Sequence, residues 1–263
     1  MRNTSPKGIC CGLVLLIPLT LAAARPAHAQ QNDFVAPGET VAAPNSLVVG
    51  DPSANEIVSK VLAENRRRNE RLQSYSVTRT YQIQTPEGKL AAQTVVRMDY
   101  RAPGARTFEK TSEKGSGIVR HLVFDRLMDS ETESSTGKEH RDSALTPANY
   151  DFRFVGVEDV GSYHCFVLEV TPKRKDKYLF EGNIWIDRQD FAVAKIEGYP
   201  AKRPSFWINH ADFVREYQKV DGFWLPLRDE TKVDVKLYGK RVFTIDHDHY
   251  VVQGQAEHKT EIE

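Results

Sequence analysis

Residues 179–200 read LFEGNIWIDRQDFAVAKIEGYP, and this stretch decides the fold. It predicts two strands joined by a tight turn at residues 187–190, where acidic side chains can accept hydrogen bonds from the turn backbone. Because successive side chains of a strand point to opposite faces, the first strand has one apolar and one mixed face. These faces carry Phe180, Gly182, Ile184 and Ile186, and Leu179, Glu181, Asn183, Trp185 and Asp187, respectively. The pattern is typical of an antiparallel sheet with one face over an apolar interior and the other toward water or a second layer.

The rest of the chain continues this alternation after one helix. Residues 53–56, Ser-Ala-Asn-Glu, form a capping box, and an apolar stripe at helical spacing follows it. Residues 118–133 predict a short helix with a polar loop after it, up to Thr146. The segments predicted to be strands are 75–83, 90–101, 106–113, 152–157, 165–171, 180–187, 191–199, 206–218, 223–235 and 240–252.

About ten strands with one or two helices predict a mainly β fold in which an antiparallel sheet curves toward a barrel. Ten strands are many for a flat open sheet, so we expect this one to curl or half close. Its inner face then either packs on itself or holds a ligand. We expect a flexible lead-in over residues 30–52, a single domain over 53–252 and a polar tail over 253–263.

The first 29 residues predict a secretory signal peptide, and therefore a periplasmic protein. They begin with basic residues, continue with an apolar run over 9–24, and end in Ala27-His28-Ala29, a small-x-small cleavage signal. The alternative is an N-terminal membrane anchor, against which Pro18 and the cleavage signal argue. Cys10 and Cys11 lie inside the apolar run and do not end it, so we expect no lipidation.

Charge and cysteine content exclude some classes of function. Without residues 1–29 the chain carries 33 basic and 36 acidic residues, a net charge of −3, which is too balanced for a nucleic-acid-binding protein. Arg66, Arg67, Arg68 and Arg71 suit a helix C-terminus and predict a solvated face, with contact to anionic lipid as the alternative. Cys165 predicts a buried apolar filler, with an intermolecular bridge or a nucleophilic thiol as alternatives.

Residues 246–249, Asp-His-Asp-His, have the spacing closest to that of a metal site. Two histidines at alternate strand positions share one face, but a site needs a third ligand, from His164, His210 or Asp212. An exposed charged strand end is the preferred interpretation, so we predict no metal and no cofactor. The chain has no nucleophile elbow, P-loop or dinucleotide-binding glycine motif, and we predict no catalytic residues and no enzymatic activity.

Several motifs in order resemble the outer-membrane lipoprotein-sorting family, the LolA/LolB-like periplasmic carriers. Residues 182–187, GNIWID, are similar to the G-x-I-W-I-D strand of that family. Residues 166–173, 193–197 and 222–226 agree with it in order and spacing, and the resemblance covers about residues 53–252. It implies a curved, incompletely closed antiparallel β-barrel with a helical lid. The gating arginine of the family stays open between Arg79, Arg97 and Arg101, and the segments 130–143 and 173–177 are longer than a minimal carrier requires.

The resemblance also implies a function, namely a periplasmic carrier that shields acyl chains of lipoproteins or lipids during transfer toward the outer membrane. Its partners would be these acyl chains and donor or acceptor envelope proteins, with transient membrane contact and no nucleic acid. The alternatives are a lipid-sensing regulatory domain of the same fold and a metal-dependent enzyme centred on His247 and His249. We expect the concave, lipid-binding face to include Phe166, Leu168, Ile184, Ile186, Phe223, Leu225, Val233 and Val235.

Overall fold

The computed structural model describes residues 52–133, 144–176, 178–204, 206 and 208–254. Helices in this part of the chain are α1 (Ala54–Arg71), α2 (Gly117–Val119), the π-helical segment η1 (Arg120–Asp125) and α3 (Arg126–Glu133). The strands are β1 (Leu72–Gln84), β2 (Leu90–Arg101), β3 (Ala105–Gly115), β4 (Tyr150–Val160), β5 (Tyr163–Pro172), β6 (Phe180–Asp187), β7 (Val193–Pro200), β8 (Ile208–Val220), β9 (Phe223–Val235) and β10 (Gly239–Gly254).

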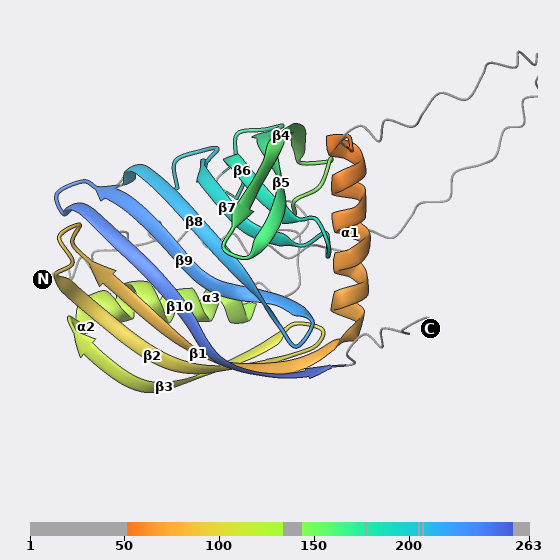
Figure 1. The fold of residues 1–263 in the computed structure, drawn as a ribbon. Coiled ribbons are helices and arrows are strands. Elements are labelled where there is room, and N and C mark those ends of the chain that lie inside the picture. The colour runs from red at the N-terminus through yellow and green to blue at the C-terminus, as the bar shows by residue number, and fades with distance from the viewer. Residues whose placement is uncertain (1–51, 134–143, 177, 205, 207, 255–263) are drawn as a thin grey trace, which may run out of the picture.

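All ten described strands form one antiparallel sheet in the order β3-β2-β1-β10-β9-β8-β7-β6-β5-β4. The sheet curves strongly, and β3 and β4 lie at its two ends without pairing with each other (Figure 1). The predicted fold class, a mainly β protein with an incompletely closed antiparallel sheet and helices, is therefore confirmed. A sheet of this size relieves its accumulated twist by curling.

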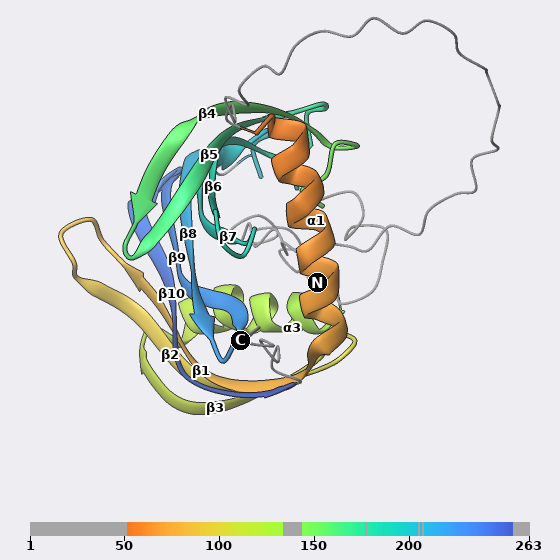
Figure 2. The same cartoon turned by 45° about the vertical axis from the view of Figure 1, so that its right-hand side comes forward.

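Helix α1 crosses the open side of the curved sheet, as Figure 2 shows. The predicted capping box is present, because the Ser53 backbone N–H donates to the Glu56 carboxylate at 2.8 Å and the Glu56 N–H donates to Ser53 Oγ at 3.3 Å. The helix buries its apolar stripe against the inner face of β4–β8. We call this the α1 cluster; its buried members are Ile57, Val58, Val61, Leu145, Tyr150, Phe166, Leu168, Val170, Leu179, Phe180, Ile184, Ile186, Val193, Ile196 and Phe213.

A second apolar cluster lies on the other half of the same inner face. The helical run from α2 to α3 covers it, and Figures 1 and 2 show this run inside the curve of the sheet. The prediction of a helix over residues 118–133 is confirmed, with a π-helical turn in its middle. We call this the α3 cluster; its buried members are Tyr81, Ile83, Ala92, Val96, Val123, Phe124, Leu127, Met128, Phe243 and Ile245.

The outer face has a smaller cluster made by Cys165, Val167, Trp185 and Ala194. Residues that alternate along β5 and β6 thus divide between the two faces as predicted, and Cys165 is buried as predicted. Leu179 is an exception: it was expected beside Trp185, but it precedes the strand and lies in the α1 cluster.

Other boundaries differ from the prediction for local reasons. Strand β7 begins at Val193, because Phe191 has a φ of 47° and belongs to the turn. This turn is built as expected, since the Asp187 carboxylate accepts the backbone N–H groups of Gln189 and Asp190 at 3.0 and 2.7 Å. Strand β1 begins at Leu72, directly after α1, and not at residue 75. Strand β10 continues to Gly254, while the predicted signal peptide at 1–29 and most of the lead-in and tail lie outside the described residues.

Close approach of β6 and β7 generates a first prediction. A Cβ on Gly182 would lie 2.0 Å from the Glu197 carbonyl oxygen, at a φ of 156°. Gly156 is a matched control, because it has a φ of 159° and a Cβ added there would meet no atom within 4 Å. We expect Gly182→Ala to lower the free energy of unfolding by roughly 2–4 kcal/mol more than Gly156→Ala does. Chemical denaturation measures both; equal losses would contradict the steric explanation.

Candidate functional site

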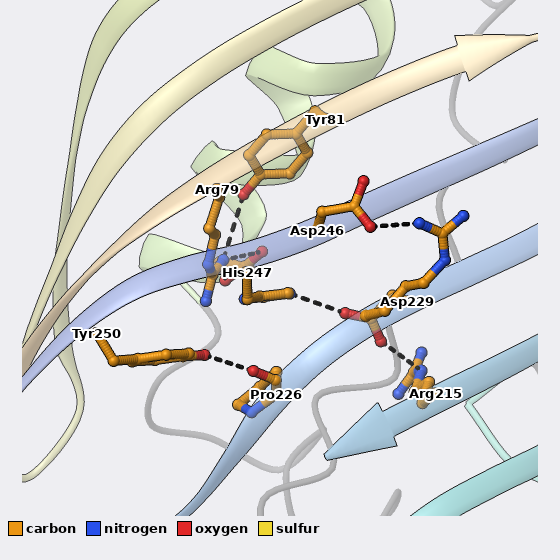
Figure 3. Close-up of polar contacts among 10 residues, drawn as sticks. Arg79, Tyr81, Arg215, Pro226, Asp229, Asp246, His247 and Tyr250 are labelled. Atoms are coloured by element: carbon orange, nitrogen blue, oxygen red, sulfur yellow. Dashed lines mark hydrogen bonds and ion pairs between the residues drawn. The ribbon is translucent and has the colours of Figure 1, made fainter. Parts of the chain in front are cut away.

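A row of charged residues crosses the inner face between the two apolar clusters. Arg79, His247, Asp229 and Arg215 come from four adjacent strands, β1, β10, β9 and β8. The strand register aligns them, because Arg79 lies opposite His247 and Asp229 lies opposite Arg215. We call these four residues the polar row (Figure 3).

Ion pairs and hydrogen bonds connect the polar row. Arg79 Nη1 lies 2.8 Å from the Glu131 carboxylate of α3 and donates to the Tyr81 hydroxyl at 3.2 Å. The Asp229 carboxylate lies 3.1 Å from His247 Nε2 and 3.4 Å from Arg215 Nε. Asp229 therefore links β8, β9 and β10, and Arg79, which lies opposite His247 in the register, ties β1 to α3.

The surroundings of the row are apolar on both sides. Tyr81 and Ile245 of the α3 cluster flank it on one side, and Phe213 of the α1 cluster flanks it on the other. Arg79, Arg215 and His247 are all buried. Charges in such surroundings interact strongly and are costly when unpaired.

Burial and pairing set the protonation states of the row. Burial raises the pKa of Asp229, but the hydrogen bond from His247 and the charge of Arg215 outweigh this, and the pKa is lowered. Burial lowers the pKa of His247, and Asp229 compensates only in part. Burial also opposes the charge on Arg79, yet Glu131 and Tyr81 raise its pKa well above the usual value. At neutral pH the row thus holds two guanidinium groups, one carboxylate and a neutral imidazole.

Two nitrogen atoms of the row have no hydrogen-bond partner among the described residues, namely Arg79 Nε and His247 Nδ1. Such unsatisfied buried groups are uncommon and costly. Arg79 Nε–H can donate to a ligand on the inner face, such as the ester or amide oxygen at the head of an acyl chain. His247 Nδ1 can accept a hydrogen bond from an amide N–H or a hydroxyl, because the ring proton is on Nε2, which donates to Asp229.

The structure brings together only part of the predicted lipid-binding set. Phe166, Leu168, Ile184 and Ile186 meet in the α1 cluster. Val233 and Val235 lie in a separate small cluster with Ile208 and Ala211. Phe223 and Leu225 are also buried but belong to neither of these clusters. Binding of lipid by the eight residues stays a prediction.

His247 and His249 do not lie together on one face, as the metal hypothesis requires. His247 is buried and bonded to Asp229, whereas His249 is exposed and has a φ of 55°. A bulge opposite Val77 interrupts the alternation at this point, so the two imidazoles lie in different environments. Among the described residues, no group of three or more His, Cys, Asp or Glu side chains could hold a metal ion.

Sequence reasoning missed two of the four residues of the polar row, and it considered His247 only as a metal ligand or as part of an exposed strand end. Arg79 was one of three candidates for a gating arginine, but Asp229 and Arg215 were not singled out. The available signal was a charged residue at an inward position of a strand with apolar inward neighbours, as with Arg215 two residues after Phe213. Arg68 also differs from the solvated arginine face predicted for α1: it is buried, and it donates to the carbonyl oxygens of Asp190 and Phe191 at 2.7 and 3.2 Å.

Comparison with known proteins gives a sequence family and a set of similar folds. A profile described as a family of unknown function, DUF5686, matches residues 88–250. A search of curated proteins gave no match. A DUF1329 family protein from Desulfovibrio piger has a TM-score of 0.42 and 13% identity, covering 80% of this chain and 95% of that one. A LolA superfamily protein from Nitrosomonas europaea has a TM-score of 0.36 and 14% identity, covering 78% and 95%.

A Vibrio parahaemolyticus structure described as an outer membrane lipoprotein-sorting protein domain has a TM-score of 0.38 and 13% identity, covering 78% and 95%. These TM-scores are below 0.5, so the function is inferred from the residues of this chain. The family profile is that of DUF5686, whereas the lipoprotein-sorting and LolA proteins are similar in fold. None of the described helices has both the length and the apolar character needed to cross a membrane.

The buried Arg79–Glu131 pair generates a second prediction. Arg79→Met leaves the Glu131 carboxylate without its guanidinium partner, and we expect the free energy of unfolding to fall by roughly 3–5 kcal/mol. Arg97→Met is the matched control; it removes an exposed pair with Asp99 and should cost less than about 1 kcal/mol. Urea denaturation measures both variants. The double variant R79M/E131L should recover part of the loss, and a double variant no more stable than R79M would contradict pairing as the cause.

The lowered pKa of His247 generates a third prediction. The unfolded chain takes up a proton on this histidine near pH 6.5, whereas the folded protein takes it up only at lower pH. The contribution to stability is therefore complete above about pH 6.5 and decreases as the pH falls through that value toward the folded pKa. We expect His247→Gln to flatten the fall in urea midpoint between pH 7.5 and 5.5. His210→Gln, which removes an exposed histidine, should leave it unchanged. An unaltered fall in H247Q would refute the assignment.

Proposed function

This chain belongs to DUF5686, a family of unknown function, and we propose that it is an exported lipid-binding protein that carries acyl chains on the inner face of its curved sheet. The observation that carries the proposal is the pair of apolar clusters on this inner face, each of them covered by helix and not by strand. The sequence features of residues 1–29 support a location in the periplasm.

Helical covers favour ligand entry for a physical reason. A helix satisfies its backbone hydrogen bonds internally, so α1 can move away from the sheet without breaking the hydrogen bonds between strands. Its contacts with the inner face are mainly apolar side chains such as Ile57, Val58 and Val61. An acyl chain that replaces these contacts gains about 0.8 kcal/mol per buried methylene group. A sheet that is not closed at β3 and β4 can also widen to admit the chain.

The polar row suits the polar end of such a ligand. An acyl chain attached to glycerol or to a protein N-terminus carries an ester or amide group, which needs hydrogen-bond partners when it is buried. Arg79 Nε and His247 Nδ1 have no partner among the described residues and lie between the two apolar clusters. We infer that the acyl chain lies along the apolar clusters with its polar group at the row.

A sensing domain of the same fold is the second candidate. The ion pair between Arg79 and Glu131 favours it, because a ligand at the row would compete for Arg79 and so change how α3 sits on the sheet. An envelope protein that binds only one of the two positions of α3 would respond to such a change. A carrier exchanges lipid between vesicles, whereas a sensor retains it and changes its affinity for a protein partner.

Native mass spectrometry tests the proposed function. The protein, expressed with its own N-terminal segment and purified from a periplasmic extract without detergent, should carry a lipid or lipopeptide mass that is lost on delipidation. The delipidated protein should then regain mass with added phospholipid or triacylated lipopeptide. A protein that is free of lipid and binds neither probe would contradict lipid binding.

Opposite faces of β5 provide a fourth prediction. Val170 lies in the α1 cluster and Val167 in the outer cluster, and both are buried on the same strand. We expect Val170→Ala to weaken the binding of a fluorescent fatty acid roughly tenfold, because two buried carbon atoms are removed from the inner face. Val167→Ala should cost similar stability and leave the affinity unchanged. Titration by fluorescence, with thermal melts of both variants, measures this; equal losses of affinity would contradict inner-face binding.

A further inference from the structure

Exposed apolar side chains gather at one end of the sheet. Four large apolar side chains are the most exposed in the described part of the chain: Leu237 at 91%, Phe206 at 75%, Ile118 at 73% and Tyr238 at 68%. Leu90 at 41% adds a fifth. Single exposed apolar residues are normal at a protein surface, but the most exposed ones lying together require an explanation.

The strand register places these residues near each other. Val235 pairs with both Ile208 and Gly239, so the β9–β10 turn with Leu237 and Tyr238 lies next to the segment before β8. Lys236 Nζ is 3.6 Å from the centre of the Phe206 ring. The β1–β2 turn ends at the level of Val242 on β10, beside the β9–β10 turn. The start of α2 joins this end through the hydrogen bond from the Ser116 N–H to the Ala91 carbonyl oxygen at 3.0 Å.

Figure 1 shows the β1–β2 turn, the β9–β10 turn and α2 at the left-hand end of the molecule. We call this end the rim; it comprises residues 85–90, 113–120, 206 and 234–241. These segments carry six basic and three acidic residues, a net charge of +3, although the whole chain has a net charge of 0. The basic residues are Lys89, Lys114, Arg120, Lys236, Lys240 and Arg241.

The backbone at Leu237 supports a role for its side chain. Leu237 has a φ of 69°, which glycine or asparagine adopts at lower cost than leucine does. A large apolar side chain thus stands at the most exposed position of a turn where neither the backbone nor contact with the protein favours it. The Leu237 side chain is therefore explained better by contact with a partner outside the chain than by contact within it.

We propose that the rim is a docking surface for an anionic lipid bilayer. The apolar side chains come from separate segments, namely the β9–β10 turn, α2, the start of β2 and the segment before β8, so they enter the headgroup region at several points, while the surrounding lysines and arginines meet lipid phosphates. A protein partner would favour a continuous apolar patch with few charges at its centre. The bilayer is therefore the partner whose chemistry matches both the exposed tips and the positive charge.

Docking at the rim does not depend on ligand binding at the inner face. The polar row and the rim share no residue, and docking is measured with intact vesicles regardless of whether lipid is extracted. The proposed function and this inference can therefore fail separately. Arg66 and Arg67 on α1 are a competing basic surface, because they are also exposed.

Co-sedimentation with large unilamellar vesicles tests the docking surface. The protein should bind vesicles of phosphatidylethanolamine and phosphatidylglycerol at a 3:1 ratio, bind vesicles of pure phosphatidylcholine at least tenfold more weakly, and lose affinity as salt is raised. L237S/Y238S should lower the partition coefficient by about tenfold or more, since both apolar tips are lost. Each of Lys89→Gln and Lys240→Gln should lower it about fivefold.

Two control variants make the result specific. Val251→Ser removes a side chain that is 62% exposed on β10 away from the rim, and it should leave vesicle binding unchanged. R66Q/R67Q removes the competing basic surface and should likewise have no effect. Binding that R66Q/R67Q abolishes and L237S/Y238S leaves intact would overturn the proposal in favour of α1. Absence of binding to the phosphatidylglycerol vesicles would overturn it altogether, and a protein partner captured through Leu237 and Tyr238 would then be the alternative.

Discussion

Pairing of the buried charges on the inner face is the constraint on which the rest of the structure depends. Removing a single ion from water costs several kcal/mol, more than the burial of one aliphatic side chain returns. Arg79, Asp229 and Arg215 are therefore compatible with a folded inner face only as members of ion pairs. The bonds of Asp229 need β8, β9 and β10 in register, and the pair of Arg79 needs α3 in place against β1, so both the register of the sheet and the position of the helix depend on this row.

The row also divides the inner face into two apolar regions with different covers. Helix α1 crosses the open side and is fastened near its end by Arg68, which donates to the turn between β6 and β7. The run from α2 to α3 lies inside the curve and is fastened by Glu131 to Arg79. Each cover thus combines an apolar stripe, which is non-directional, with polar contacts that set its position, among them the one just named; the run from α2 to α3 is also held to β3 by Lys110 and Asp125 at 2.8 Å. A ligand that competes for the polar contact can release a cover without unfolding the sheet.

Much of the fold was predictable because the periodicity of apolar residues is a local signal: all ten strands of the described chain were expected from a period of two, and both helical regions from helical spacing. The alternation failed where the backbone leaves the strand conformation: Phe191 and His249 have positive φ values, and the bulge near His249 separates it from His247. The polar row was not predictable in the same way, because it is assembled from residues that are far apart in the sequence, up to 168 positions for Arg79 and His247. Only the pairing order of the strands brings these side chains together. The site was therefore predicted as an apolar face, without the charges that cross it.

Two surfaces of different chemistry follow from one sheet. The strands place apolar residues on the inner face by alternation, but the turns are free of this rule, and their tips can carry exposed apolar and basic residues without cost to the core. The inner face suits an acyl chain because it excludes water, whereas the rim suits a bilayer surface because its charges stay hydrated until they meet phosphate. A protein that takes lipid from a membrane needs both properties at once, since the ligand must leave the bilayer close to the place where the cover opens. The turn after β1 and the turn before β10 belong to the same strands that supply Arg79 and His247, so docking at the rim would place the polar row about half a strand length from the membrane surface.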